Sequence, residues 1–479
     1  MMKKLNLVIL SLIFISSDLF AQTAPIDNVC KDESAIKSSD VISCYRQQLA
    51  AQPLKYWFMS NEMYGDVEVN RYQMISQNWS PAGLVTPSQW TENVAIAIPP
   101  HPKSTRALIA VDTSDAILLE VAKATNTIVI SLQTIPSRDL IYQDDGKPRV
   151  EDDSIARTWR LFMDEPVQRQ QLPLHVPMAA TISQSIRLAK KELKKYDINK
   201  FIVTGASKRG WATWLAGISD PSVEAIVPFV IDVLDTRQVM QNMYRSYGGN
   251  WPVAFAPYYN QDIDQQTKKA DFTKLMQIED PLSYMGTSRE SRLAIPKYII
   301  NASGDDFFVP DNTRYYYDKL PGIKSLRIAP NTGHIGIIDF TQQSLISFIN
   351  RIQDNKPLPQ VTAAPYPQLD NGKLDVKFSE KPAKVVRWTA TNPAARDFRF
   401  ACGIKYEPTE LTVSANNDVD VPLDYTGPGW QASFVEATFS DGYVATSQVY
   451  ITPDAKYPTT APAAMADNAA CTTLPGRGL

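Results

Sequence analysis

Short segments that are apolar throughout recur along most of the chain, and segments with helical periodicity separate them. Strands that are apolar on both faces must be covered on both faces, and intervening helices favour parallel pairing. This alternation of apolar strands and helices therefore predicts an α/β protein with a largely parallel sheet between helices. Two other segments, 66–79 and 90–100, alternate apolar and polar residues as half-buried strands do. The expected apolar strands are 106–112, 127–134, 200–205, 223–233, 296–304 and 324–330, and the expected helices are 115–126, 177–196 and 342–353.

The N-terminal residues have the pattern of a secretory signal. Two lysines precede an apolar run from Leu5 to Ile15, and Ala21 stands at a plausible cleavage position. The apolar run is too short to span a bilayer. We therefore predict that residues 1–21 are a signal peptide, that the chain has no transmembrane segment, and that the protein is exported to the periplasm or secreted.

Composition divides the rest of the 479-residue chain. A short N-terminal segment over 22–49 precedes an α/β domain over 50–355. Two insertions in that domain, 135–176 and 234–292, are expected to form lids or binding walls, as long excursions from strand ends usually do. The proline-rich stretch 356–368 reads as a linker. Short alternating runs then predict an immunoglobulin-like β-sandwich within 356–455, followed by a polar tail, 456–479.

The four cysteines are expected to be oxidised, because an exported protein folds in an oxidising compartment. Of the three possible pairings we favour the local one, Cys30–Cys44 and Cys402–Cys471. No C-x-x-C is present and no histidine lies near a cysteine, so neither a metal nor a cofactor is expected. The net charge is −3 without a basic block, which argues against a nucleic-acid partner. The sequence does not indicate an oligomeric state.

A serine between a buried strand and a helix is the first candidate for chemistry. It is Ser207 in the stretch TGASKRGW. A nucleophile elbow of the α/β-hydrolase type forces its serine into a strained conformation and needs small neighbours, here Gly205 and Ala206. The usual glycine two residues after the serine is replaced by Arg209, and Gly210 follows one place later. A serine that caps a helix would give a similar pattern.

Two further residues, in the chain order required of such enzymes, favour a catalytic function. Asp305 and Asp306 directly follow a buried strand, where the acid of a triad belongs, and we favour Asp305. His334 follows the next strand in a glycine-flanked loop. The prediction is that Ser207 attacks, His334 transfers the proton and Asp305 orients the imidazole. The other two histidines are interpreted as structural or surface residues: His101 and His175.

An oxyanion hole requires two N–H donors. The backbone of Lys208 should supply one, and the loop at Thr113 and Ser114 the other. The side chains of Lys208 and Arg209 have two interpretations. Either they bind the oxyanion or a substrate carboxylate, or they are helix-start residues paired with acids elsewhere.

Aromatic residues in the second insertion are expected to wall the site or, equally, to form the core of a packed lid. The candidates for substrate contact are Trp251, Tyr258 and Tyr259, with Tyr244 and Tyr247 nearby.

These motifs resemble the family of PhoPQ-activated pathogenicity-related proteins, over roughly residues 50 to 455. The resemblance implies an exported α/β-hydrolase-like protein with an appended β-sandwich, and it places the presumed triad on Ser207, Asp305 and His334. It implies no substrate. One departure is DTSD after the first buried strand, where the family tends to have glycines, which weakens the assignment of Thr113 and Ser114. The matching segments include LQTIPSRDLIY, EDDSIARTW, VTGASKRGWATWL, PKYIINASGDDFFVPD, PNTGHIG and RWTATNPAARDFR.

The principal interpretation is a serine hydrolase that acts on an ester, an amide or a carbohydrate-linked group. Because the family includes a secreted protein that represses cell proliferation, a non-catalytic binding or signalling protein on a hydrolase scaffold is an alternative. The SKRG turn also resembles the G-x-S-R-x-G turn of glucuronoyl esterases. That resemblance implies a carbohydrate esterase whose acid follows the earlier strand, at Asp232 or Asp235.

Overall fold

A computed structural model describes most of the chain. The predicted signal peptide and part of the predicted linker lie outside the described residues. Among the described helices, none combines the length and the apolar character needed to cross a membrane. The described residues are 27–31, 36–103, 105–136, 139–363, 372–465 and 467–479.

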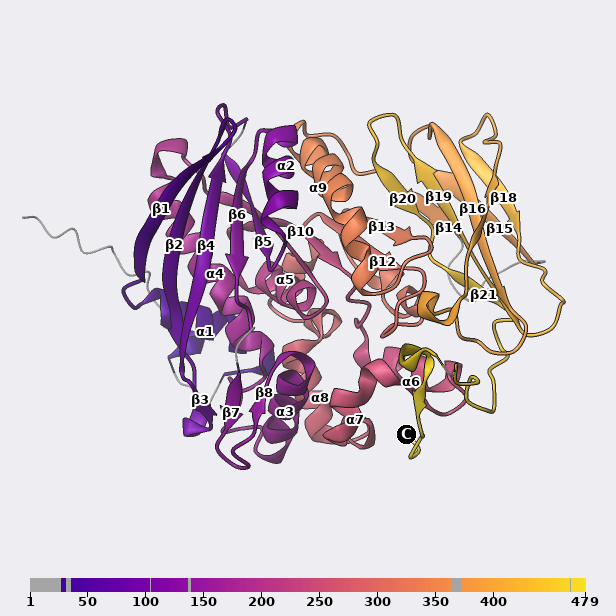
Figure 1. Cartoon of the computed structure of the whole chain (residues 1–479), viewed down its shortest axis with the longest axis horizontal. Helices are drawn as coiled ribbons and strands as arrows, with labels where there is room; N and C mark the ends of the chain where they lie inside the picture. Colours follow the sequence, from indigo (N-terminus) through magenta and orange to yellow (C-terminus); the bar gives the residue numbers. More distant parts are fainter. Residues whose placement is uncertain (1–26, 32–35, 104, 137–138, 364–371, 466) are drawn as a thin grey trace, which may run out of the picture.

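A nine-stranded sheet forms the centre of the larger part of the molecule (Figure 1). The strands from β6 to β13 in spatial order are parallel, whereas β1, β2 and β4 pair antiparallel. The predicted large, mostly parallel sheet is therefore confirmed. In spatial order the strands are β1 (Lys55–Tyr64), β2 (Val67–Asn78), β4 (Gln89–Ile98), β6 (Ile128–Gln133), β5 (Arg106–Val111), β9 (Lys200–Ala206), β10 (Val223–Phe229), β12 (Lys297–Ala302) and β13 (Lys324–Ala329).

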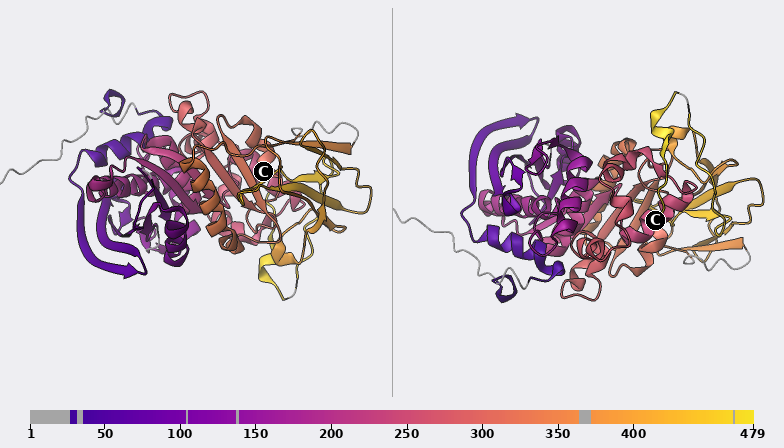
Figure 2. Two further views of the ribbon diagram at one scale, coloured as in Figure 1. Left: turned by 90° about the horizontal axis from the view of Figure 1, so that it is seen from above. Right: turned by 90° about the horizontal axis from the view of Figure 1, so that it is seen from below.

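Helices cover both faces of this sheet (Figure 2). One face carries α2 (Asp115–Thr125) and α9 (Ile338–Gln353), and the other carries α1 (Val41–Ala50), α4 (His175–Glu192) and α5 (Lys208–Ser219). Successive residues of β5 alternate between two cores. Ala107 and Ile109 pack on the side of α4 and α5, and Leu108 and Ala110 on the side of α2 and α9. Both faces being buried is the reason that the strands are apolar throughout.

Two strands of the nine-stranded sheet differ from expectation. β1 was not predicted, because it is an edge strand whose residues are mostly exposed, including Trp57 and Phe58, so no buried face imposes an alternating pattern. β10 ends at Phe229 rather than at residue 233. The backbone of Val230 has a φ of 42°, which turns the chain out of the sheet.

The two insertions lie together at one end of the sheet (Figure 1). The first forms β7 (Leu140–Tyr142), β8 (Pro148–Arg149) and α3 (Glu151–Asp164), and β7 also pairs with β3 (Val85–Thr86). The second forms α6 (Thr236–Ser246), β11 (Trp251–Pro252), α7 (Ala256–Asn260) and α8 (Ala270–Glu279).

Antiparallel sheets follow at the C-terminal side of the molecule, beside β12 and β13 (Figure 1). Tyr298 of β12 stacks on Tyr443, with ring centroids 4.7 Å apart, and the Ile328 N–H of β13 donates to Thr446 at 3.0 Å. The two regions therefore share a core. The immunoglobulin-like arrangement stays a prediction. One sheet contains β14 (Val361–Ala363), β15 (Lys373–Phe378) and β18 (Asp418–Pro422), and the other contains β16 (Lys384–Asn392), β17 (Glu407–Glu410), β19 (Trp430–Thr438), β20 (Val444–Thr446) and β21 (Tyr450–Thr452).

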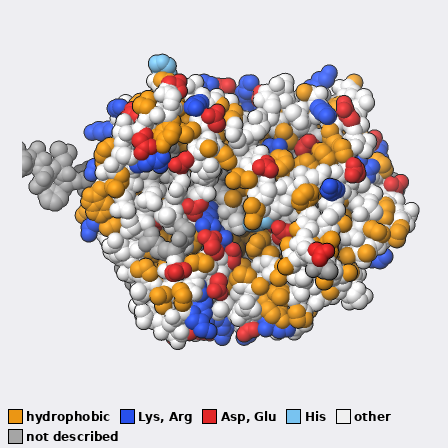
Figure 3. Space-filling model, viewed as in Figure 1, with side chains coloured by type: hydrophobic (Ala, Val, Ile, Leu, Met, Phe, Trp, Pro, Cys, Tyr) orange, Lys and Arg blue, Asp and Glu red, His pale blue; other side chains and the backbone are white. Residues whose placement is uncertain are grey.

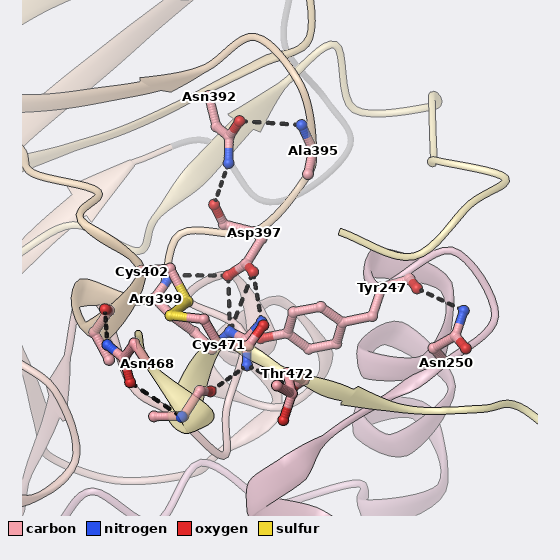
Figure 4. Close-up of polar contacts among 12 residues, drawn as sticks. Tyr247, Asn250, Asn392, Ala395, Asp397, Arg399, Cys402, Asn468, Cys471 and Thr472 are labelled. Atoms are coloured by element: carbon pink, nitrogen blue, oxygen red, sulfur yellow. Dashed lines mark hydrogen bonds and ion pairs between the residues drawn. A yellow bond between two sulfur atoms is a disulfide. The ribbon is translucent and has the colours of Figure 1, made fainter. Parts of the chain in front are cut away.

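Both predicted disulfides are present, Cys30–Cys44 and Cys402–Cys471. The second joins the C-terminal tail to the segment around Arg399, a buried residue (Figure 4). The Arg399 guanidinium pairs with Asp397 at 2.7 Å and donates to the carbonyl oxygen of Ala470 at 2.7 Å. It also lies 5.0 Å from the ring centroid of Tyr247 in the second insertion.

The tail continues from this cluster onto the second insertion. Its strand β22 (Thr473–Leu474) pairs with β11. Arg477 then forms ion pairs with Asp262 and Asp264, at 2.7 and 2.5 Å. The last residues of the chain thus hold the insertion in place.

Replacing Cys402 and Cys471 together by serine is expected to lower the free energy of unfolding by about 4 kcal/mol, because the bond closes a long loop in the unfolded chain. The tail should also become sensitive to limited proteolysis. Urea unfolding and mass spectrometry of the fragments measure both effects. The matched control replaces Cys30 and Cys44, which should cost about 3 kcal/mol and leave the tail protected. A tail that is equally resistant in both variants would contradict the role assigned to Cys402–Cys471.

Candidate active site

Ser207 lies at the turn between β9 and α5, with φ 56° and ψ −129°. A residue with a side chain rarely adopts a positive φ, and it does so only where its surroundings hold it. Here the Ser207 N–H donates to the carbonyl of Phe229, and its own carbonyl accepts the N–H of Trp211, both at 2.9 Å. Within the described helix α5 the Ser207 side chain makes no capping hydrogen bond, so the helix-cap interpretation does not account for it.

Two glycines let the strand and the helix approach each other at this turn. A Cβ atom on Gly205 would lie 2.8 Å from the backbone of Arg209, and one on Gly210 would lie 2.9 Å from the carbonyl oxygen of Gly205. Real Cβ contacts are almost never that short, so a side chain at either position would push the helix away. Gly210, one place later than the usual glycine of the motif, therefore allows the helix to lie close to the strand.

His334 is held by Asp305. Its Nδ1 lies 2.9 and 3.1 Å from the two carboxylate oxygens, and the backbone N–H of Phe307 donates to the same carboxylate at 2.7 Å. The Phe307 ring lies 4.8 Å from the imidazole. With Nδ1 engaged, Nε2 is the ring nitrogen free to exchange a proton.

Ser207 and His334 line the same hollow. Among the hydrogen bonds of the described residues, none joins the two side chains. Catalytic hydrogen bonds are often long in ligand-free enzymes and tighten when substrate binds.

Among the described hydrogen bonds, none joins His334 to any of the other candidate acids. Asp306 follows Asp305 but makes no hydrogen bond to the histidine, and burial raises its pKa, as does the charge of Asp305. Asp232 is buried and accepts a hydrogen bond from Tyr316, and burial raises its pKa to about 8. Asp235 pairs with Lys319 at 3.0 Å.

Both cations beside the serine are paired with acids. Lys208 contacts Glu151 and Asp152 of α3, at 2.8 and 2.9 Å. Arg209 binds Glu151 through two hydrogen bonds of 2.7 and 2.8 Å and also donates to Asp112 at 2.8 Å. Burial alone would raise the pKa of Glu151, but the two cations outweigh it and lower the pKa to about 2. The structure therefore agrees with the second interpretation of these cations, in which they are helix-start residues paired with acids.

These contacts link the elbow to the first insertion. Glu151 and Asp152 open α3, and their charges are balanced by residues at the start of α5. Figure 3 shows acidic and basic side chains side by side near the middle of one face of the molecule.

Of the three residues predicted for the oxyanion hole, Lys208 and Thr113 lie beside Ser207, and Ser114 does not line the hollow in the described structure. Lys208 is the first residue of α5, where backbone N–H groups have no partner within the helix. Thr113 lines the hollow that contains Ser207 and His334. Ser114 lies one residue further on, and its carbonyl accepts the Leu118 N–H at the start of α2. In the described part of the chain Ser114 is not among the residues that line the hollow.

Of the two interpretations given to the aromatic residues of the second insertion, Tyr258 fits a wall of the site, whereas Trp251 and Tyr259 fit a packed lid core. Tyr258 lines a pocket beside Ser207, and its hydroxyl donates to Asp152 at 3.1 Å. Trp251, by contrast, is fully buried, stacks on Phe255 and belongs to β11, whose backbone pairs with β22. Tyr259 is covered by the tail, with the Arg477 guanidinium 3.9 Å from its ring centroid.

The two remaining histidines fit the structural and surface interpretation. His175 is buried, pairs with Glu279 and stacks on Trp211 with ring centroids 4.6 Å apart. His101 is exposed.

Two cavities meet at Ser207. The outer hollow, of about 340 Å³, contains His334, Thr113, Asp112 and Arg209. The inner pocket, of about 50 Å³, is lined mainly by apolar side chains of α3, α5, α6 and the loop after β12. Lys208 and Asp152 are its charged members, and they are paired with each other.

Residues 42–399 match the family described as PhoPQ-activated pathogenicity-related protein. The chain belongs to this family. Its relatives include autocrine proliferation repressor protein A of Dictyostelium discoideum, which is 30% identical over 432 residues, covering 80% of this chain and 84% of the relative.

Solved structures similar to this family member include two acetyl xylan esterases. The enzyme from Thermoanaerobacterium sp. JW/SL YS485 has a TM-score of 0.41 and 14% identity, and the alignment covers 64% of this chain and 92% of that one. The enzyme from Paenibacillus sp. R4 has a TM-score of 0.42 and 14% identity, with 65% and 92% covered.

Some residues around the site in this family member were not identified from sequence. The acids that neutralise Lys208 and Arg209 were expected only as unnamed partners, although the run EDD at 151–153 stood in a family-like segment. The apolar residues Val239, Met240 and Met243 of α6 were also missed. Their spacing on one face of a helix was the signal that could have found them.

Proposed function

We propose that the protein is a serine hydrolase that cleaves an ester or amide bond. The observation that carries the proposal is the strained turn at Ser207, which shares a hollow with a histidine held at Nδ1 by Asp305. The nine-stranded sheet with an elbow after β9, an acid after β12 and a histidine after β13 has the element order of the α/β hydrolases. Together with the predicted signal peptide, the two disulfides support an exported protein.

In the proposed reaction, Ser207 Oγ bonds to the carbonyl carbon while His334 Nε2 takes its proton. The carbonyl oxygen becomes an oxyanion, stabilised by the backbone N–H of Lys208 and by a donor from the loop at Thr113. His334 then gives the proton to the leaving group as the acyl bond breaks, which leaves an acyl-enzyme. Water, deprotonated by His334, then bonds to the carbonyl carbon of the acyl-enzyme. The bond from this carbon to Ser207 Oγ breaks, His334 returns the proton to Oγ, and the carboxylic acid leaves.

A fluorophosphonate probe tests this proposal directly, because it reacts with activated serines. The folded protein should be labelled at Ser207, as shown by mass spectrometry of the modified peptide. The second candidate function, a non-catalytic binding or signalling protein, is favoured by the relationship to a proliferation repressor. Folded protein that remains unlabelled by a probe small enough to enter the hollow would favour that second function.

The rate of hydrolysis is expected to fall as the pH is lowered through a midpoint above 6.5. Burial alone lowers the pKa of His334, but the charge of Asp305 and its hydrogen bond outweigh burial and raise the pKa above 6.5. Because the neutral imidazole is the base, activity is present above this pKa and is lost below it. The profile of kcat/KM against pH measures the midpoint. A midpoint at or below 6.5 would mean that Asp305 does not stabilise the charged imidazole in solution.

A further inference from the structure

Ser207 lies on the boundary between two cavities of different character. The inner pocket is lined by apolar side chains that include Trp159, Trp211, Val239, Met240, Met243 and Phe307. The outer hollow contains Thr113, Arg209 and His334. A substrate bonded to Ser207 Oγ must therefore place its parts in one cavity or the other.

Besides Ser207 Oγ, the reacting carbon carries three groups: the leaving group, the oxyanion and the rest of the acyl group. The chemistry determines where the first two must lie. The leaving group has to lie where His334 can protonate it, and the oxyanion has to point toward its donors. His334 and Thr113 line the outer hollow, whereas Lys208, whose N–H is the other donor, begins α5 directly after Ser207 and lines the inner pocket. The third group, the rest of the acyl group, is left to the inner pocket.

Resting on the proposed function, we infer that the inner pocket binds the acyl group of the substrate and admits only a short, uncharged one. The pocket has a volume of about 50 Å³. A single water requires roughly 10–15 Å³ on this scale, so the space suits an acyl chain of about two to four carbons. The paired charges of Lys208 and Asp152 leave no net charge at the pocket wall to balance a charged acyl group.

The outer hollow sets no comparable limit on the leaving group. Its volume is about 340 Å³, and at its rim Ile335 is 85% exposed and Ile338 is 49% exposed. The alcohol or amine part of the substrate can therefore be large, whereas the acyl part cannot.

Residues of α6 determine the size of the inner pocket. Val239, Met240 and Met243 all line it and are buried. Shortening Met243 should deepen the pocket, and enlarging Val239 should fill it. Met276, in α8, is a buried methionine of the same insertion that does not line the pocket in the described structure.

The test compares kcat/KM for p-nitrophenyl acetate, butyrate and octanoate. The wild type should favour the acetate and the butyrate over the octanoate by roughly tenfold or more. Met243→Ala should raise the relative rate on the octanoate by a similar factor, and Val239→Phe should lower the rate on the butyrate more than on the acetate. Met276→Ala should keep the wild-type ratios. Thermal unfolding identifies any variant that does not fold, and Met240→Ala, which also shortens a side chain of the pocket, replaces Met243→Ala if that variant does not fold.

The possible outcomes separate the two proposals. If the wild type hydrolyses none of the esters and reacts with no fluorophosphonate, the proposed function fails. If the esters are hydrolysed but the chain-length ratios of Met243→Ala and Val239→Phe equal those of the wild type, the inner pocket does not bind the acyl group. An octanoate preference in the wild type would also overturn the inference.

Discussion

Replacement of Ser207 by alanine is expected to lower kcat by roughly six orders of magnitude, which is the loss seen when the nucleophile of a well-studied serine protease is removed. The reason is that no other described side chain at the elbow can form the acyl-enzyme. Fluorophosphonate labelling should disappear together with activity. Hydrolysis of p-nitrophenyl acetate and mass spectrometry of the labelled protein measure the two effects.

Ser219→Ala provides a matched control for this experiment. Ser219 is a buried serine at the other end of α5, and in the described structure its hydroxyl has no hydrogen-bond partner. Its loss should leave labelling, activity and thermal stability close to those of the wild type. Activity that survives Ser207→Ala would show that hydrolysis takes place without the elbow serine, and the proposed mechanism would fail.

Asp305→Asn is expected to lower kcat by roughly four orders of magnitude, because an amide can stabilise the wrong tautomer of the histidine. In the structure both carboxylate oxygens of Asp305 lie within hydrogen-bond distance of His334 Nδ1. Loss of the carboxylate also removes the negative charge that raises the pKa of His334. The effect should therefore fall on kcat much more than on KM.

Asp306→Asn is the matched control for that substitution, since it makes the same chemical change one residue away. Asp306 makes no hydrogen bond to His334 in the described structure, so the variant should keep most of its activity. The kinetics of both variants, with thermal unfolding to verify folding, decide the assignment. If Asp306→Asn were inactive and Asp305→Asn active, Asp306 would be the acid of the triad. If both variants were active, neither aspartate would take part in the mechanism.

The sheet could be predicted from sequence because its signals are local. A strand buried on both faces is apolar at every position, as in β5 and β9, and such a run can be recognised without knowing its neighbours. The Cys30–Cys44 disulfide was predictable for a similar reason, since only 14 residues separate the two cysteines, and Cys402–Cys471, 69 residues apart, is then the pair that remains. The edge strand β1 was missed because exposure on most of its length leaves no pattern.

The candidate site could be predicted only in part. The order of Ser207, Asp305 and His334 along the chain, each after its own strand, is a property of the sequence. Which of two adjacent aspartates faces the histidine is not, because it depends on the backbone path of the loop after β12, where the Phe307 N–H donates to Asp305 and the Phe307 ring contacts the imidazole.

The tertiary structure alone decided the surroundings of the serine. Lys208 and Arg209 are neutralised by acids that lie more than 50 residues earlier in the sequence, and no local pattern says which acids these are. Trp251 packs between Tyr244 and Phe255 and in the described structure lines neither cavity, and its strand β11 pairs with β22 from the end of the chain. The sequence determines which residues are apolar enough to be buried and which are charged and need a partner. Which partner each residue meets depends on contacts between distant segments, and these contacts exist only once the chain has folded.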